Sequence, residues 1–297
     1  MRLDDFKITI RNDIIQLYRN STGSKTEILV QPPLLAVYPK SWDSAFFKKK
    51  FGAVQLEDPD NLNRLTDFQV AVALERLTAS VDENHYDIIE LTIDIDQTRL
   101  IPLFEDVGFR LVDSRITFIT PINRKAFPPE PLPAGTIKYA SWDDLEAIVT
   151  LTYESFVDND QFFSRFKNRR YFTEDETRRY YREWIANHIG DADTHFIVVK
   201  DNDRLYAYYI YKKTRFLEEK PVYKAILTAV DPAFRGNRFH MRMQAYLIQQ
   251  FPEEAFFLDN TSQLTNISII RSYIRSQKQL NSIALTFYRE KNPECLK

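Results

Sequence analysis

The chain has 297 residues, of which 44% are hydrophobic and 28% are charged, a balance typical of globular proteins and not of disordered or membrane-embedded ones. Its net charge of −2 creates no field that would draw it to nucleic acid, and a single cysteine, Cys295, excludes an intramolecular disulfide. No segment resembles a signal peptide or approaches the roughly 18 apolar residues of a membrane span. We therefore expect a cytoplasmic protein with no membrane partner.

The first half of the chain shows two strand patterns around a helix pattern. Apolar residues alternate with polar ones over residues 87–96, and apolar residues at helical spacing follow over 98–107. Gly108 is placed to cap that helix, because glycine readily adopts the left-handed conformation found there. Alternation returns over residues 110–119, which predicts a second strand.

A proline-rich stretch separates the two halves. Four prolines occur between residues 125 and 133, and proline fits neither a helix interior nor a central strand. We predict an N-terminal domain over residues 1–124, an extended linker over 125–135 and a second domain over 136–297.

The second half mixes strand and helix patterns. Strands are predicted over residues 137–139, 195–200, 205–212, 222–230, 255–258 and 280–288, and helices over 142–156, 174–188, 239–251 and 266–276. Such a mixture, with some strands in hairpins, predicts an α+β protein built on a mixed sheet.

A weak internal repeat relates the ends of the two halves. Residues 103–118 align without gaps on residues 272–287, so that Phe104 matches Tyr273 and Leu111 matches Leu280. The match indicates either two related half-domains or a chance similarity between two amphipathic helix–strand pairs.

The most informative segment spans residues 227–241, where a predicted strand leads through a short loop into a helix. Amides at the start of a helix have no internal partners, and the helix dipole is positive there, so this position suits a pyrophosphate. Arg235, Arg238 and His240 would add positive charge at the same place. The simpler alternative is an ordinary strand–turn–helix with an exposed basic turn.

The residues Val230-x-Pro232-x-x-Arg235-Gly236 resemble the acetyl-CoA-binding motif of the GNAT superfamily. The resemblance implies an acyl-CoA cosubstrate, no metal, and a set of cofactor-binding residues. Those residues are Thr228, Ala229, Val230, Arg235, Gly236, Asn237, Arg238, Phe239 and His240. The chain departs from the family pattern at Arg238 and His240, where the family has glycine and either glycine or alanine.

The predicted helix over 266–276 resembles the C-terminal helix of the same superfamily. Asn266 and Tyr273 are seven residues apart, close to two helical turns, so they lie on one helix face. The resemblance implies that Asn266 holds the cofactor arm and that the Tyr273 hydroxyl protonates the departing thiolate. The structural alternative for Tyr273 is a core tyrosine.

Along its length the chain most resembles two-domain sugar-nucleotide N-acyltransferases of the TDP-fucosamine acetyltransferase type. The matching segments occur in the same order in both, at residues 41–47, 104–118, 164–166, 180–187, 272–276 and 287–289. The resemblance implies a smaller GNAT-like α/β N-terminal domain without catalytic residues and a catalytic GNAT domain in the C-terminal half. The implied reaction is acylation, with acetyl or a larger group such as hydroxybutanoyl, of a TDP-linked amino-dideoxy sugar for surface polysaccharide (lipopolysaccharide) biosynthesis.

The substrate site is predicted in the loop over residues 161–171. Arg165 would contact a diphosphate and Phe163 a base, although a charge-rich loop of this kind is as often only solvated. No general base is identified; His195, Asp231 and a water chain are the candidates.

Three alternatives stay open: a peptide, lysine or antibiotic amine as acceptor, a non-catalytic GNAT scaffold, and a nucleic-acid binder, which the acidic residues among its basic ones disfavour. The prediction allows for a homodimer.

Overall fold

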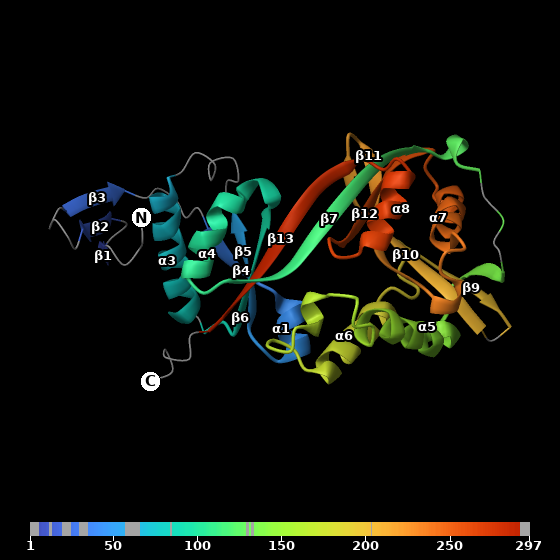
Figure 1. The fold of residues 1–297 in the computed structure, drawn as a ribbon, viewed down its shortest axis with the longest axis horizontal. Coiled ribbons are helices and arrows are strands. Elements are labelled where there is room, and N and C mark those ends of the chain that lie inside the picture. The colour runs from blue at the N-terminus through green and yellow to red at the C-terminus, as the bar shows by residue number, and fades with distance from the viewer. Residues whose placement is uncertain are drawn as a thin grey trace. The chain divides into compact units, whose positions relative to one another are not determined.

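The computed structural model describes residues 6–11, 14–19, 25–29, 35–56, 66–83, 85–128, 131, 134–202 and 204–291 (Figure 1). The chain divides into two compact units. Unit 1 comprises Met1–Leu111 with Thr286–Lys297, and unit 2 comprises Val112–Leu285. Within the described residues, no helix has the length and apolar character needed to cross a membrane.

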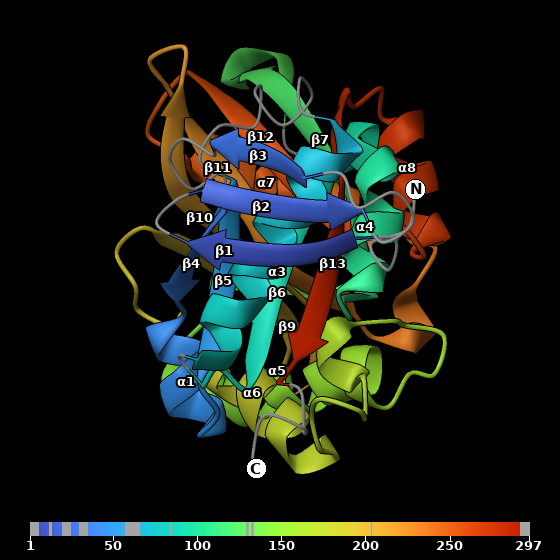
Figure 2. The ribbon, with the colours of Figure 1, turned by 90° about the vertical axis from the view of Figure 1, so that its left-hand side faces the viewer.

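Unit 1 contains two sheets. Three antiparallel strands, β1 (Phe6–Arg11), β2 (Ile14–Arg19) and β3 (Lys25–Leu29), form the first sheet (Figure 2). The second has the order β4 (Leu35–Pro39), β5 (Phe51–Leu56), β6 (Ile88–Asp94) and the end of β13 (Leu280–Glu290). Its helices are α1 (Ser41–Phe47), α3 (Asp67–Glu83) and α4 (Ile101–Asp106).

Unit 2 is a mixed sheet with helices on both faces. Its strand order is β13, β7 (Arg110–Asn123), β12 (Ala255–Gln263), β11 (Lys220–Val230), β10 (Arg204–Leu217), β9 (Thr194–Asp201) and β8 (Thr136–Tyr139). The helices are α5 (Leu145–Thr152), α6 (Glu174–Ala186), α7 (Phe239–Gln250) and α8 (Ile267–Arg275).

Two hydrophobic cores lie on opposite faces of this sheet. Tyr209 and Tyr211 of β10 face the core that contains Met243 of α7. Their neighbour Tyr208 faces the other core, with Ile148 of α5 and Tyr181 of α6. The alternation follows from the two-residue period of a strand and fixes which side chains share a face with α7 (Figure 1).

Local signals set several element boundaries. Thr173 caps α6, since its side chain accepts from Glu176 N at 3.1 Å while the Glu176 carboxylate accepts from Thr173 N at 2.7 Å. Gly108 has a φ of +88° directly after α4, as expected of a helix-capping glycine. The helix predicted over 142–156 is more irregular, because α5 ends at Thr152 and a π-helical turn covers Tyr153–Val157.

The unit boundaries differ from the predicted linker at residues 125–135. The divisions fall at Leu111/Val112 and Leu285/Thr286, inside strands β7 and β13. Unit 1 therefore includes the end of β13, which comes from the second half of the sequence. Unit 2 includes most of β7, which comes from the first half. A proline-rich segment marks a change in the sequence, but it does not mark where the compact units divide.

Candidate functional site

Strands β11 and β12 are paired over only part of β11 and then separate. They pair in parallel only where Val222–Lys224 faces Phe257–Asp259; beyond this point β12 continues alongside β7. Asp231 N donates to Tyr206 O in β10 at 2.8 Å, and neighbouring strand residues direct their backbone groups to opposite sides. The N–H groups of Thr228 and Val230 therefore point away from β10, toward the side of β11 that is no longer paired with β12.

The loop after β11 brings basic side chains to the start of α7. Asp231 accepts from Ala233 N at 2.8 Å and so shapes the loop's first turn. Arg235, Gly236, Asn237 and Arg238 are all exposed. Helix α7 has 12 residues, and its first hydrogen bond runs from Arg242 N to Arg238 O at 3.1 Å. The N–H groups before Arg242 lack helical acceptors, which makes this helix start suitable for an anion.

Arg238 has the backbone conformation of a glycine. Its φ is +60°, in the left-handed region, and Gly236 two residues earlier has a φ of +84°. The loop thus has a backbone that glycine favours, and the strain at the arginine destabilises it by about 1–3 kcal/mol. A glycine at position 238 would adopt the same backbone without this strain.

A buried polar cluster lies between the sheet and α7. The polar cluster consists of Tyr209, Tyr211, His240, Gln244, Asn260, Tyr273 and Lys278. Asn260 is its centre, since its Nδ2 donates to Tyr211 Oη at 2.6 Å and to Tyr209 Oη at 3.2 Å. The tyrosine hydroxyls and amides bond one another, whereas His240 Nδ1 is buried with no hydrogen-bond partner among the described residues; such an interior is costly to disturb.

His240 belongs to this cluster and not to the loop surface. Its Nε2 lies 3.0 Å from Tyr209 Oη, and burial, with a smaller effect of nearby Lys278, lowers its pKa to about 3. The imidazole is therefore neutral at physiological pH and does not add the positive charge predicted for it. The His240 backbone N–H, in the first turn of α7, remains a candidate phosphate ligand.

Tyr273 stands on α8 with its ring inside the same cluster. It is 2% exposed, and its ring lies 5.3 Å from that of Phe118 and 5.7 Å from that of His240. Burial raises the pKa of its hydroxyl well above the usual value. The hydroxyl is thus fully protonated at neutral pH, as a proton donor must be.

Lys278 is a site residue that sequence reasoning did not propose. Its Nζ donates to Asn260 Oδ1 at 2.6 Å and to Gln244 Oε1 at 3.0 Å, and lies 5.0 Å from the centre of the Tyr273 ring. Burial lowers its pKa to about 7. A signal existed in the internal repeat, because Lys278 aligns with Phe109 and so places an amine where the first half has a phenyl ring.

Helices α7 and α8 contact one another at the C-terminal end of α8, whereas Asn266 stands at its N-terminal end. Ser276 Oγ donates to Met241 Sδ at 3.0 Å, which connects α8 to the first turn of α7. Asn266 caps α8, with its side-chain oxygen accepting from Ile269 N at 3.3 Å. Its Nδ2 is thus the group left to contact a cofactor arm.

The predicted substrate residues lie elsewhere in unit 2, before α6. Phe163 is 43% exposed, and the Arg165 guanidinium lies 5.0 Å from the ring centre of Phe166. The two candidate bases are engaged: Asp231 pairs with Arg204 at 3.2 Å, and His195 Nδ1 lies 3.4 Å from Tyr139 Oη. Among the residues described, no group of three or more His, Cys, Asp or Glu side chains is arranged to hold a metal ion.

No protein-family model matches the chain, and neither does any curated protein. Solved structures do match it. A functionally unknown conserved protein from Staphylococcus epidermidis aligns with a TM-score of 0.59 at 12% identity, over 89% of this chain and 94% of that one. A GCN5-related N-acetyltransferase from Sphaerobacter thermophilus aligns with a TM-score of 0.52 at 12% identity, over 95% and 81%.

A GCN5-related N-acetyltransferase from Kribbella flavida aligns with a TM-score of 0.50 at 13% identity, over 97% of this chain and 90% of that one. Likeness at such low identity shows the fold. The chain has the GNAT fold, an α+β mixed sheet with flanking helices, and the predicted fold class is confirmed.

Proposed function

We propose that the protein is an acyl-CoA-dependent N-acyltransferase. The observation that carries the proposal is the separation of β11 from β12 after Lys224 and Asp259, which leaves a strand edge that leads to a basic helix start. A strand edge offers hydrogen bonds to the amides of a pantetheine arm, and the α7 start offers N–H groups to a pyrophosphate. Both features belong to unit 2, as does Tyr273.

Carbonyl activation and thiolate protonation each have a candidate group, and the proton that the amine loses as the amide forms passes to solvent. The N–H groups of Thr228 and Val230 would stabilise negative charge on a thioester carbonyl oxygen, because they point toward the open edge. The attacking amine must be neutral, and alignment of the two reactants supplies much of the rate. Tyr273 would donate its proton to the thiolate as the carbon–sulfur bond breaks, since its phenol stays protonated at neutral pH.

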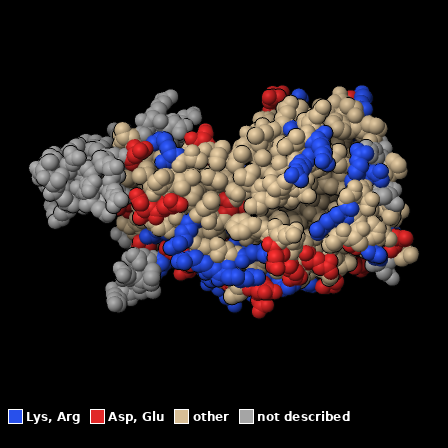
Figure 3. Space-filling view, in the orientation of Figure 1, with Lys and Arg blue, Asp and Glu red and all other residues tan. Residues whose placement is uncertain are grey.

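For the acceptor we propose a TDP-linked amino-dideoxy sugar, with acetyl or a larger group such as hydroxybutanoyl transferred to its amine. The support is the order of sequence segments shared with sugar-nucleotide N-acyltransferases. On the face of the molecule in Figure 3, basic and acidic side chains are interspersed, an arrangement that favours a small acceptor over a nucleic acid.

The test is release of free CoA thiol from a panel of acyl-CoAs, each mixed with TDP-linked 3-amino and 4-amino-dideoxyhexoses. Release that requires one donor and one sugar supports the whole proposal. Thiol release with a peptide or lysine amine, and with none of the sugars, would support acyl transfer from CoA but show that the acceptor is not an amino sugar.

One observation favours a second function, a GNAT scaffold that binds a ligand without catalysis. Tyr273 is 2% exposed, and its neighbours Tyr211, Asn260 and Lys278 are bonded to one another. The thiol-release assay separates the two functions: a scaffold of this kind releases no thiol from any acyl-CoA with any amine, whether or not it binds acyl-CoA.

A further inference from the structure

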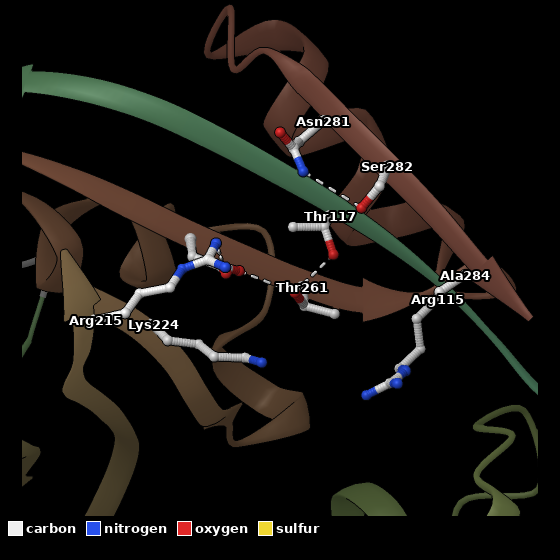
Figure 4. A pocket seen from close by; sticks show the side chains of 9 residues that line it. Arg115, Thr117, Arg215, Lys224, Thr261, Asn281, Ser282 and Ala284 are labelled. Atoms are coloured by element: carbon white, nitrogen blue, oxygen red, sulfur yellow. Dashed lines mark hydrogen bonds and ion pairs between the residues drawn. The ribbon is translucent and has the colours of Figure 1, made fainter. Parts of the chain in front are cut away.

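A polar pocket of about 210 Å³ opens on the face of the unit 2 sheet opposite α7 and α8 (Figure 4). Asp259 and Thr261 of β12 line it, whereas Leu258 and Asn260 between them face α7. The strand period thus separates the pocket from the polar cluster by the thickness of the sheet. Its full lining is Arg115, Thr117, Arg215, Lys224, Asp259, Thr261, Asn281, Ser282 and Ala284.

The lining carries three cations and one carboxylate. Asp259 is already engaged, because its Oδ1 accepts from Thr261 Oγ1 at 3.0 Å and its Oδ2 lies 3.7 Å from Arg215 Nη2. Asp113, next to the pocket, approaches Arg115 Nε only at 4.0 Å. Positive charge therefore exceeds negative charge at this place, in a protein whose net charge is −2.

Two of the cations have unused donors. The Nε of Arg115 is buried and makes no hydrogen bond, and the side-chain ammonium of Lys224 makes no hydrogen bond or ion pair with any residue that the structure describes. Figure 4 shows their side chains reaching toward one another from opposite sides of the pocket. Donors that converge on a concavity without a protein acceptor are suited to an oxyanion, which accepts charge-assisted hydrogen bonds from both.

The position of the pocket relates it to the proposed reaction. Lys224 and Asp259 are the last residues that β11 and β12 pair before they separate. A cofactor arm that runs along the unpaired edge of β11 from the α7 start would end where β11 and β12 pair again, at Lys224 and Asp259. The pocket lies on the other face of the sheet at that point. A second substrate held in the pocket would thus approach the acyl group from the face opposite α7.

We propose that this pocket binds an oxyanion, and, on the basis of the proposed function, that the oxyanion is the phosphate or carboxylate group of the acyl acceptor. Lys224 and Arg115 contact it directly, while Arg215 is held by Asp259 at the rim. This assignment moves the acceptor's charged group from the Arg165 loop to the sheet.

The test is calorimetric titration of the full chain, at low ionic strength with CoA present in excess, using inorganic pyrophosphate as the phosphate probe and succinate as the carboxylate probe. Lys224→Gln and Arg115→Gln should each weaken binding of the preferred probe about tenfold. Lys138→Gln is the matched control, because Lys138 is an exposed strand residue of unit 2 outside the pocket and its loss changes net charge equally. Melting temperatures confirm that the variants fold.

Equal affinities in Lys224→Gln, Arg115→Gln and Lys138→Gln would overturn the proposal, as would a wild-type chain that binds neither probe. A separate titration with CoA alone tests the proposed function. If the wild-type chain binds no CoA but pyrophosphate still depends on Lys224, the oxyanion site stands and the acyltransferase does not. Once an acceptor is known, Lys224→Gln should raise its KM with little change in kcat.

Discussion

The helix–turn–strand segments that end the two halves of the sequence have the same backbone and different chemistry. After α4, Phe109 N donates to Phe104 O at 2.9 Å and Gly108 N to Glu105 O at 3.0 Å. After α8, residues 278 and 277 make the equivalent bonds to residues 273 and 274, at 3.1 and 3.0 Å. Both are Schellman turns, which end a helix on one left-handed residue.

The side chains at two equivalent positions separate the halves. In the first half, Phe104 and Phe109 lie ring to ring at 6.2 Å. In the second half, Tyr273 and Lys278 occupy the same places, with the ammonium 5.0 Å from the ring centre. One turn therefore buries an inert aromatic pair, and the other places a half-buried amine beside a buried phenol. Buried ionisable groups are concentrated at functional sites, so the comparison favours the second half as the site.

Each of these helices packs on a strand from the other half of the sequence: α4 on β13, and α8 on β7. The Phe104 ring lies 5.9 Å from that of Phe287 in β13, and the Tyr273 ring lies 5.3 Å from that of Phe118 in β7. Phe118 and Phe287 are equivalent positions of the repeat, so each helix packs on the strand that follows the other helix in sequence. The repeated contacts support two related half-domains over chance similarity.

The largest effect is expected from Tyr273→Phe, which gives the second turn the aromatic residue of the first. Turnover in the thiol-release assay should fall about 100-fold or more, since general acid catalysis contributes 10²–10⁴-fold, while the affinity for acyl-CoA should persist. Tyr208→Phe is the matched control, because Tyr208 is also fully buried and its hydroxyl bonds Thr152 at 2.8 Å in the other core. Equal turnover in the two variants would remove Tyr273 from the mechanism.

A smaller effect, in stability, is expected at Lys278. Its pKa is about 7 in the folded chain and ~10.4 when unfolded, so between these values the unfolded chain binds more protons and stability rises with pH. The free energy of unfolding of the wild type should gain about 1–2 kcal/mol over Lys278→Met from pH 7 to pH 9, after allowance for partial exposure. The groups facing Lys278 are Tyr273, His240, Gln244 and Asn260.

Chemical denaturation of both proteins at several pH values measures this difference. The pKa of His240 is about 3, and the Tyr273 pKa lies well above its usual value of 10, so neither group titrates between pH 7 and pH 9. Parallel stability curves for wild type and Lys278→Met would show that Lys278 keeps an ordinary pKa and is not the buried amine that separates the two halves.

Local signals in the sequence predicted much of the fold. Gly108, the alternation now seen in β6 and the helical spacing now seen in α6 all act within a few residues, so they can be read without tertiary information. The predicted strand over 255–258 was too short, since β12 continues through polar residues to Gln263. Its end is held by pairing with β7, a contact far away in sequence.

The candidate site was predicted less completely, because it too depends on contacts between residues far apart in the sequence. The proposed phosphate loop is one contiguous segment, and its motif was visible at Arg235 and Gly236. The direction of the His240 side chain depends on Tyr209 and Lys278, which belong to other elements. The oxyanion pocket draws its lining from five strands, so only the sheet register brings Arg115 and Lys224 together.

The smallest effect is expected from the left-handed residues of the two turns. Gln277 has a φ of +54°, whereas its counterpart Gly108 has +88°. Left-handed backbone costs a residue with a side chain ~1–2 kcal/mol, partly offset by glycine's greater freedom in the unfolded chain. Gln277→Gly should therefore stabilise the protein by about 0.5–1 kcal/mol, and Gly108→Gln should destabilise it by a similar amount.

Sterics do not complicate the reverse substitution, because a Cβ on Gly108 would meet nothing closer than Arg289 Nε at 4.0 Å. Opposite shifts in the midpoint of denaturation, with an unchanged dependence on denaturant, are the expected result. If both variants lost stability, the Gln277 side chain would contribute more than its backbone costs, and the two turns would differ in energetics as well as chemistry. Opposite shifts would instead confine the difference between the halves to the pairs Phe104–Phe109 and Tyr273–Lys278.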